Sequence, residues 1–127
     1  MDCHPKHAII TQHAQARLIE RVRTYEGFPN WKQMVYYVRY HGRHGKGLTT
    51  AEHLWKKQNV FKNNKTKVRF FKEFAFVFDG TKSLVLVTVL VVDVGPFLEQ
   101  AERKDIVSAE KLQEKHRLLE LAMTRLV

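Results

Sequence analysis

The pattern that most restricts the fold lies in residues 67–92, where apolar side chains recur with a period of two. Residues 67–72 (KVRFFK) and 74–78 (FAFVF) read as two strands, and residues 84–92 (LVLVTVLVV) read as a third. An Asp-Gly pair in the intervening DGTK segment is typical of a tight hairpin turn. We therefore predict an antiparallel sheet of three or four strands within residues 66–94.

The third predicted strand is apolar on both faces, and Thr88 is its only polar side chain. This composition favours a central strand that is covered on both sides. A buried threonine usually forms a hydrogen bond with the backbone or with a neighbouring side chain. The alternative is that Thr88 presents its hydroxyl from the sheet into a functional site.

Two helices precede the predicted sheet. The first covers about residues 11–25, because Gly27 suits a left-handed helix cap and Pro29 cannot continue a helix. Asn30 can then cap a second helix over residues 31–41, in which apolar positions recur every three to four residues. We expect both helices to pack on the sheet, and residues 1–10 to form a short polar lead-in.

A long helix is predicted at the C-terminal end. Gly95 and Pro96 stop the third strand, residues 97–105 read as a short helix, and Ser108 caps a final helix over residues 109–126. One stripe of this helix carries Leu112, His116, Leu119, Met123 and Leu126. We expect it either to cover the second face of the sheet or to pair with a partner helix in a homodimer. The whole pattern predicts one α+β domain over residues 1–127.

The first predicted helix places chemically different residues on two stripes, with Thr11 as its N-cap. His13, Arg17 and Arg21 recur at intervals of four, so an imidazole and two guanidiniums share one stripe. The neighbouring stripe is apolar and can dock on a core, with Ala14, Leu18 and Val22. An imidazole beside two cations suits a base next to a phosphate. The same stripe is also typical of a solvent-exposed basic face.

The chain is strongly basic. Its 22 Lys and Arg residues against 13 Asp and Glu give a net charge of +9 and an isoelectric point near 9.9. Such a surplus favours a polyanionic partner, with nucleic acid first and an acidic protein or a membrane surface second. A soluble basic protein without such a partner is the alternative.

The cysteine content and the apolar runs indicate the cellular compartment of the protein and whether it holds a metal or a cofactor. Cys3 is the only cysteine, so no internal disulfide can form, which fits a reducing compartment. The first ten residues lack the apolar core of a signal peptide, and the run at 84–92 is too short to span a bilayer. We therefore expect a cytoplasmic protein without membrane association. Cys3, His4 and His7 have no second cluster at ligand spacing, so we expect no metal and no cofactor.

Residues 42–65 form a basic connection between the second helix and the sheet. Gly42 and Gly47 have the spacing of a Walker phosphate-binding loop. However, Leu48 stands where that loop needs a lysine, which excludes the motif. A short helix over residues 51–58, capped by Thr50 with His53 three residues later, is expected inside this connection.

Lysines in this connection alternate with Trp55 and Phe61. That arrangement suits RNA or single-stranded nucleic acid, in which cations meet phosphates and rings stack on bases. A solvated loop with both aromatic rings tucked into the core is the alternative. The candidate nucleic-acid-binding residues in the connection and the first strand are Arg43, Lys46, Lys56, Lys57, Lys62, Lys67, Arg69 and Lys72.

The order of two helices and then antiparallel strands, with His13, Arg17 and Arg21 on the first helix, resembles a known group. The residues match the HAxxRMxxR pattern of a family of small bacterial and phage domains of uncharacterised function. Those domains are similar to the barnase/EndoU/colicin/RelE superfamily of metal-independent ribonucleases. In the family, the sheet half often reads as a hairpin that ends in a strand like lvVvTvy. Residues 76–80 (FVFDG) and 86–90 (LVTVL) occupy those positions here.

The resemblance covers residues 10–92. It implies His13 as a general acid or base, Arg17 and Arg21 as phosphate clamps, and Thr88 as a contributor of a hydroxyl. It also implies an antitoxin or immunity protein as a partner. The chain departs from the family in its longer basic connection and in its C-terminal helix, which has no counterpart there.

The first functional hypothesis is a toxin-type, RNA-binding endoribonuclease. The 2′-hydroxyl of the RNA attacks the phosphate, a base removes its proton, cations stabilise the phosphorane, and an acid protonates the leaving 5′-oxygen. No metal is needed. Arg69 or Lys72 can add positive charge to this site. The candidates for the second proton-transfer group are Tyr36, Tyr37, His41 and His44.

The second hypothesis is a non-catalytic, phage-type effector on the same scaffold, which docks on a host protein or on nucleic acid. The long connection and the C-terminal helix motivate it. A DNA-binding module ranks below both. Its second helix carries tyrosines and valines where a recognition helix needs polar groups that read bases.

Overall fold

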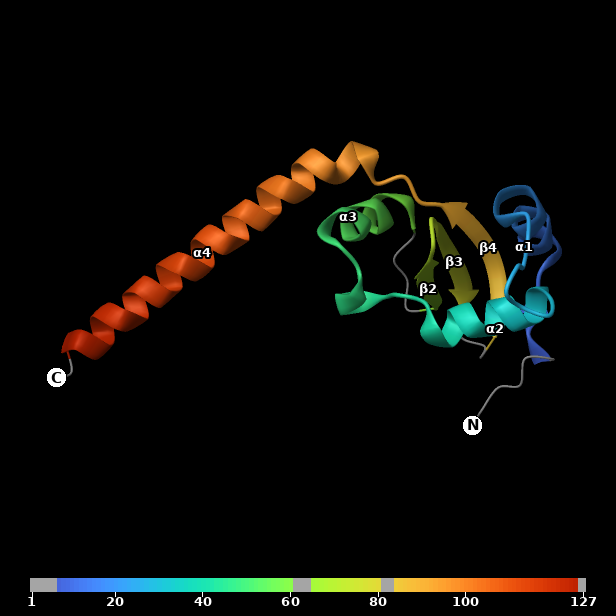
Figure 1. Cartoon of the computed structure of the whole chain (residues 1–127), viewed down its shortest axis with the longest axis horizontal. Coiled ribbons are helices and arrows are strands. Elements are labelled where there is room, and N and C mark those ends of the chain that lie inside the picture. The colour runs from blue at the N-terminus through green and yellow to red at the C-terminus, as the bar shows by residue number, and fades with distance from the viewer. Residues whose placement is uncertain (1–6, 61–64, 81–83, 126–127) are drawn as a thin grey trace.

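The computed structural model describes residues 7–60, 65–80 and 84–125, and within these ranges the chain has the expected α+β fold (Figure 1). Its strands are β1 (Ile9–Ile10), β2 (Thr66–Phe71), β3 (Phe74–Asp79) and β4 (Val85–Val91). Its α-helices are α1 (Gln12–Arg17), α2 (Trp31–His41), α3 (Thr50–Asn59) and α4 (Leu98–Arg125). A π-helical turn, η2 (Leu18–Val22), follows α1, and two 3-10 turns are η3 (Gly45–Gly47) and η4 (Gly95–Phe97).

The four strands form one sheet in the order β1-β4-β3-β2. Strands β2, β3 and β4 pair antiparallel, as predicted. Strand β1 instead pairs parallel with β4, with Ile9 opposite Val85 and Ile10 opposite Leu86, so the sheet is mixed rather than antiparallel. Its fourth strand comes from the segment that was expected to be a lead-in. Two residues are too few to display an alternating pattern, so no sequence signal marked this strand.

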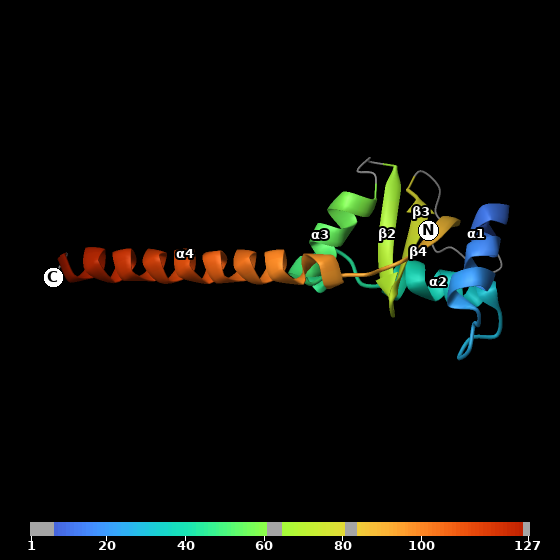
Figure 2. The same ribbon diagram turned by 90° about the horizontal axis from the view of Figure 1, so that it is seen from above.

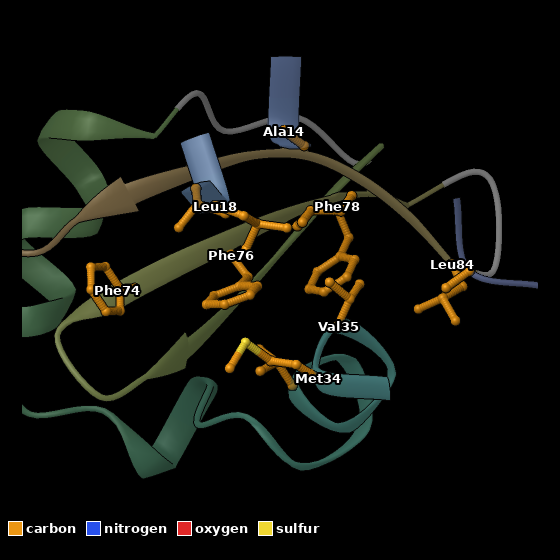
Figure 3. Packing of buried hydrophobic residues seen from close by; sticks show 12 residues of the cluster. Ala14, Leu18, Met34, Val35, Phe74, Phe76, Phe78 and Leu84 are labelled. Carbon is orange, nitrogen blue, oxygen red and sulfur yellow. The ribbon is translucent and has the colours of Figure 1, made fainter. Parts of the chain in front are cut away.

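Different helices cover the two faces of the sheet (Figure 1). Phe74, Phe76 and Phe78 of β3 share one face and pack with Met34 and Val35 of α2, as Figure 3 shows. Ala14 of α1, Leu18 of η2 and Leu84 belong to the same cluster. On the other face, α3 packs through Trp55 against Phe70, with the ring centroids 5.7 Å apart, and the cluster also contains Val68, Ala75 and Val77.

The prediction that β4 is covered on both faces holds only in part. Leu86 and Val89 are buried in the cluster on the α2 face, and Leu90 packs against the cluster on the α3 face. Val87 and Val91 are 41% and 51% exposed. The pairing of β3 with β4 shifts between Val77 and Phe78, which gives β4 one extra residue at Val87, as in a β-bulge. Valine is common in strands because it fits a pleated surface, so an apolar run alone does not prove burial on both faces.

The first helix is shorter and less regular than predicted. It begins as expected at Thr11, whose hydroxyl accepts a hydrogen bond from the Ala14 N–H. After Arg17 the backbone widens into η2, and the helix ends at Arg23, which has a φ of +73°. The predicted end at residue 25 is therefore wrong. Helices commonly end at a glycine with positive φ, and a non-glycine residue in that conformation is uncommon. The sequence therefore indicated an end near Gly27 and Pro29, whereas Arg23 adopts the positive φ four residues before Gly27.

The second helix matches its prediction, because the Asn30 side chain caps α2 by accepting a hydrogen bond from the Gln33 N–H. Helix α3 begins one residue earlier than expected. Its cap is Thr49, which forms a reciprocal capping box with Glu52. The predicted cap at Thr50 with His53 is thus wrong, since only a carboxylate or amide side chain completes the box.

Glu52 also ties α3 to the sheet. Two parallel hydrogen bonds of 2.7 Å join the Arg43 guanidinium to the Glu52 carboxylate. The backbone N–H and C=O of Arg43 exchange hydrogen bonds of 2.8 Å with those of Phe70 on β2. Gly42 allows this close approach, because a Cβ there would lie 2.5 Å from the Val38 carbonyl oxygen and 2.8 Å from the Arg69 Cβ.

Helix α4 is one 28-residue helix, not the two segments predicted, and Ser108 lies inside it rather than at its cap. No glycine or proline interrupts it, so nothing breaks the helix there. Its first turns pack on α3, where Ala101 is buried and the Thr50 hydroxyl donates to the Asp105 carboxylate at 2.7 Å.

The rest of α4 projects straight away from the body of the protein (Figures 1 and 2). It does not cover the second face of the sheet, which α3 covers instead, so that alternative is wrong. The pairing of α4 with a partner helix stays a prediction. Over residues 7–60, 65–80 and 84–125, no helix has the length and apolar content needed to cross a membrane.

The Arg43–Glu52 pair yields a prediction about stability. Hydrogen bonds from the Arg43 guanidinium hold the pKa of the Glu52 carboxyl below its ordinary value of 4.5. Glu52→Gln should lower the free energy of unfolding at pH 7 by about 1–3 kcal/mol, because it weakens both the ion pair and the capping box. A carboxylate whose pKa is lower in the folded state than in the unfolded state stabilises the folded protein fully above the pKa of the unfolded state. That stabilisation is lost as the pH falls through the pKa of the folded state.

The difference in the free energy of unfolding between wild type and Glu52→Gln should therefore shrink as the pH falls below about 4.5. Urea unfolding at several pH values measures it. Glu99→Gln is the matched control, because the Glu99–Arg103 pair is 79% and 75% exposed. We expect it to change the free energy of unfolding by less than about 1 kcal/mol. Equal stability of Glu52→Gln and wild type at pH 7 would contradict this account of α3.

Candidate functional site

The structure brings two of the predicted catalytic residues into contact. His13 lies in the first turn of α1, and Thr88 lies in the middle of β4, 75 residues further along the chain. The His13 Nε2 and Thr88 Oγ1 atoms are 3.0 Å apart, which is hydrogen-bonding distance. His13 is exposed and Thr88 is half-buried, so both groups can meet a solute. The contact fixes the imidazole beside the sheet.

Hydrogen bonds to the free edge of β4 hold α1 in this position. Strand β1 ends at Ile10, and the chain then continues along β4 as a helix. The Thr11 N–H donates to the Leu86 carbonyl, and the Thr11 hydroxyl donates to the Val87 carbonyl, both at 3.2 Å. The Arg21 guanidinium donates to the Val89 carbonyl at 2.5 Å. These donors form the hydrogen bonds with β4 carbonyls that the backbone of a longer β1 strand would otherwise form.

The two arginines of the predicted stripe differ in their surroundings. Arg21 bonds to the sheet, because the π-helical turn after Arg17 shifts it away from a regular 3.6-residue stripe. Arg17 forms an ion pair of 2.6 Å with Glu20, whose side chain is 60% exposed. An exposed ion pair contributes about 0–1 kcal/mol, so a phosphate can displace Glu20 from Arg17. Arg17 is therefore the cation of the stripe that is available to a phosphate.

The structure does not bring a second proton-transfer candidate to this site. Thr88 pairs with Val77, so its side chain lies on the α3 side of the sheet. The candidates Tyr36, Tyr37 and His41 belong to α2, on the opposite side, and His44 follows α2. Tyr37 instead contacts His41, with the ring centroids 4.9 Å apart. Sequence spacing could not reveal on which side of the sheet each helix packs.

The predicted nucleic-acid-binding residues are spread over several surfaces. Arg43 is occupied by Glu52, and Lys62 lies outside the described residues. Lys56 and Lys57 lie in the last turn of α3, Lys46 in η3, Lys67 and Arg69 on β2, and Lys72 in the β2–β3 turn. Trp55 is 4% exposed and packs in the core, so it cannot stack on bases. Phe61, its expected companion, lies outside the described residues.

A cationic cluster at the end of α2 was not singled out from the sequence. The Arg39 guanidinium lies 5.2 Å from the centroid of the Tyr40 ring and 6.0 Å from that of Phe78. Its Nε is buried and has no hydrogen-bond partner in the structure. Arg69 on β2 lies beside the same helix end, next to Gly42. We call Arg39 and Arg69, with the His44 imidazole beside them, the α2–β2 cation cluster.

Within residues 7–60, 65–80 and 84–125, no carboxylate forms an ion pair with Arg39 or Arg69. Burial lowers the pKa of Arg69, and the charge of Arg39 lowers it further. The charge of Arg69 lowers the pKa of His44, with smaller contributions from burial, Arg39 and Lys56. Cations that repel one another without an acidic partner favour binding of an anion such as phosphate. No spacing in the sequence links positions 39, 44 and 69, so only the fold reveals the cluster.

Over the described residues, no group of three His, Cys, Asp or Glu side chains is placed to hold a metal ion. Cys3 and His4 of the trio considered from the sequence lie outside those residues. Comparisons with protein-family models, curated proteins and solved structures give no match. The functional argument therefore rests on the His13–Thr88 contact, the surrounding cations and the sequence pattern of α1.

Proposed function

We propose that the protein binds RNA and cleaves it as a metal-independent endoribonuclease. The observation that supports this most directly is the 3.0 Å contact between His13 Nε2 and Thr88 Oγ1. It joins the histidine of the HAxxRxxxR helix to the threonine of the central strand. The resemblance to the barnase/EndoU/colicin/RelE superfamily assigns roles to both of these residues, as it does to Arg17 and Arg21.

In this proposal, His13 is the general base that takes the proton of the RNA 2′-hydroxyl. The 2′-oxygen attacks the adjacent phosphorus, and Arg17 stabilises the added negative charge on the phosphorane. The bond from phosphorus to the 5′-oxygen breaks, and that oxygen takes a proton from His13 or from water. The products are a 2′,3′-cyclic phosphate and a 5′-hydroxyl. Thr88 orients the imidazole, and Arg21 holds the helix on β4.

The distribution of charge supports an RNA substrate. Helix α4 contains six acidic and six basic residues, so the net charge of +9 belongs to the remainder of the chain. That remainder carries the His13 site and the α2–β2 cation cluster. Tyr40, which is 44% exposed, lies beside Arg39 and contacts Tyr36 with the ring centroids 5.0 Å apart. Guanidiniums beside accessible rings suit a single strand, in which phosphates alternate with bases.

The cleavage step is tested with purified protein, a labelled RNA oligonucleotide and EDTA. We expect cleavage products with cyclic phosphate ends. His13→Ala should reduce the rate by about 10²–10⁴-fold, the range typical of a lost acid or base. Thr88→Val should reduce it less, because that residue acts through the imidazole. His53→Ala, an exposed histidine on α3, is the control and should keep the wild-type rate. Cleavage that persists in His13→Ala would exclude this site.

RNA binding is tested separately, by fluorescence anisotropy with an oligonucleotide that carries 2′-O-methyl groups and cannot be cleaved. The double variant Arg39→Gln/Arg69→Gln should weaken binding and reduce the slope of log affinity against log salt by about 1–2. The control is Arg103→Gln, an exposed arginine of α4. His13→Ala should still bind. If the double variant binds as tightly as wild type at every salt concentration, the cation cluster does not contact RNA.

A second candidate function is a non-catalytic effector of phage type that docks on a protein partner. The observation that favours it is the part of α4 that projects away from the body (Figure 2). Large apolar side chains are exposed on this part. An antitoxin, immunity protein or host protein fits such a helix. Under this alternative, His13→Ala leaves partner binding unchanged, and substitutions in α4 abolish it.

A further inference from the structure

Helix α4 has two parts with different surroundings. Its first turns line an apolar groove with the start of α3, where Leu98, Ala101 and Asp105 face Thr50 and Ala51. From residue 110 to residue 124, every side chain is exposed. Figures 1 and 2 both show this second part far from the sheet and the other helices.

The exposed part continues the stripe that already packs on α3. The positions of α4 that face α3 are three or four residues apart, and the same spacing continues through the projecting half of the helix. We call these continuing positions the seam, which consists of Leu112, His116, Leu119 and Met123. Leu112, Leu119 and Met123 are 57%, 52% and 67% exposed. Burying one such side chain is worth about 1.5–3 kcal/mol, so the seam favours a covering surface.

We propose that the seam is covered by the same segment of a second copy of this chain, running antiparallel. The seam positions are symmetric about a point between Arg117 and Leu118. When one helix is reversed about that point, Leu112 faces Met123 of the other copy and His116 faces Leu119. Each seam side chain of one copy then meets a different residue type of the other copy, as in an antiparallel helix pair.

Helix α3 decides the direction. In a parallel pair, the first turns of both α4 helices would face each other along the stripe that α3 already occupies. In the antiparallel pair, Met123 of the second copy lies opposite Leu112. The second helix therefore ends close to Ala109, before the stretch that α3 covers.

Charge favours the same arrangement. Helix α4 has equal numbers of acidic and basic residues, so two copies of it do not repel one another as wholes. The body carries the entire +9, and a parallel pair would place two such bodies side by side. An antiparallel overlap of residues 110–125 places them at opposite ends of about 24 Å of helix. That distance exceeds the screening length of roughly 8–10 Å at physiological salt.

The association is tested by analytical ultracentrifugation of the full chain over a range of concentrations. We expect the mass of a dimer, and Leu119→Asp should reduce it to the mass of a monomer. Leu118→Asp is the matched control, because Leu118 has a similar exposure of 54% but lies off the seam. It should stay dimeric. A wild-type monomer at all concentrations, or equal loss of the dimer in both variants, would overturn the proposal.

The direction is tested by disulfide formation in a Cys3→Ser background. Leu112→Cys and Met123→Cys are prepared as separate variants and are oxidised alone and as a mixture. An antiparallel pair predicts covalent dimers in the mixture and few in either variant alone. Rapid cross-linking of Leu112→Cys alone would overturn the antiparallel arrangement. Neither experiment contains RNA, so the result is independent of the proposed ribonuclease activity.

Discussion

The closure of the β4 edge is the constraint on which the rest of the body depends. Strand β1 supplies only two residues, and the edge beyond it is satisfied by donors from Thr11 and Arg21. A sheet edge with unpaired carbonyls invites association with other chains, so these donors protect the strand. They also fix the first helix beside the sheet. The His13–Thr88 contact is a consequence of that closure, because the edge bonds set the position from which the imidazole reaches the strand.

The molecule separates its charge from its exposed apolar surface. The compact body is strongly basic, and α4 is electrically balanced and carries a row of exposed leucine and methionine side chains. A basic surface attracts RNA over long distances, and an apolar helix associates only on contact. The two proposed interactions therefore use different parts of the chain and different forces, so each can operate without disturbing the other.

The sequence singled out two residues that the fold brings together, but it did not reveal their surroundings. His13 was noted for its stripe and Thr88 as the one polar residue of an apolar strand, and their side chains lie 3.0 Å apart. Arg43 and Trp55 were assigned to nucleic acid, but the fold uses one in the Glu52 ion pair and the other in the core. Arg39 was overlooked, because its position beside Arg69 depends on how α2 packs against β2. Contacts between distant segments leave no mark in local spacing.

The sequence by itself determined those features that depend on interactions between residues close together in the chain. Alternation in β2 and short apolar runs bounded by turn residues in β3 and β4 indicated the strands, and the side-chain caps at Thr11 and Asn30 specified where two helices begin. Tertiary structure decided the rest: the parallel strand β1, the end of the first helix at Arg23, and the single continuous α4. The physical reason is the range of the interactions. Caps and alternation act over a few residues, whereas edge closure and packing act between segments that only the complete fold brings together.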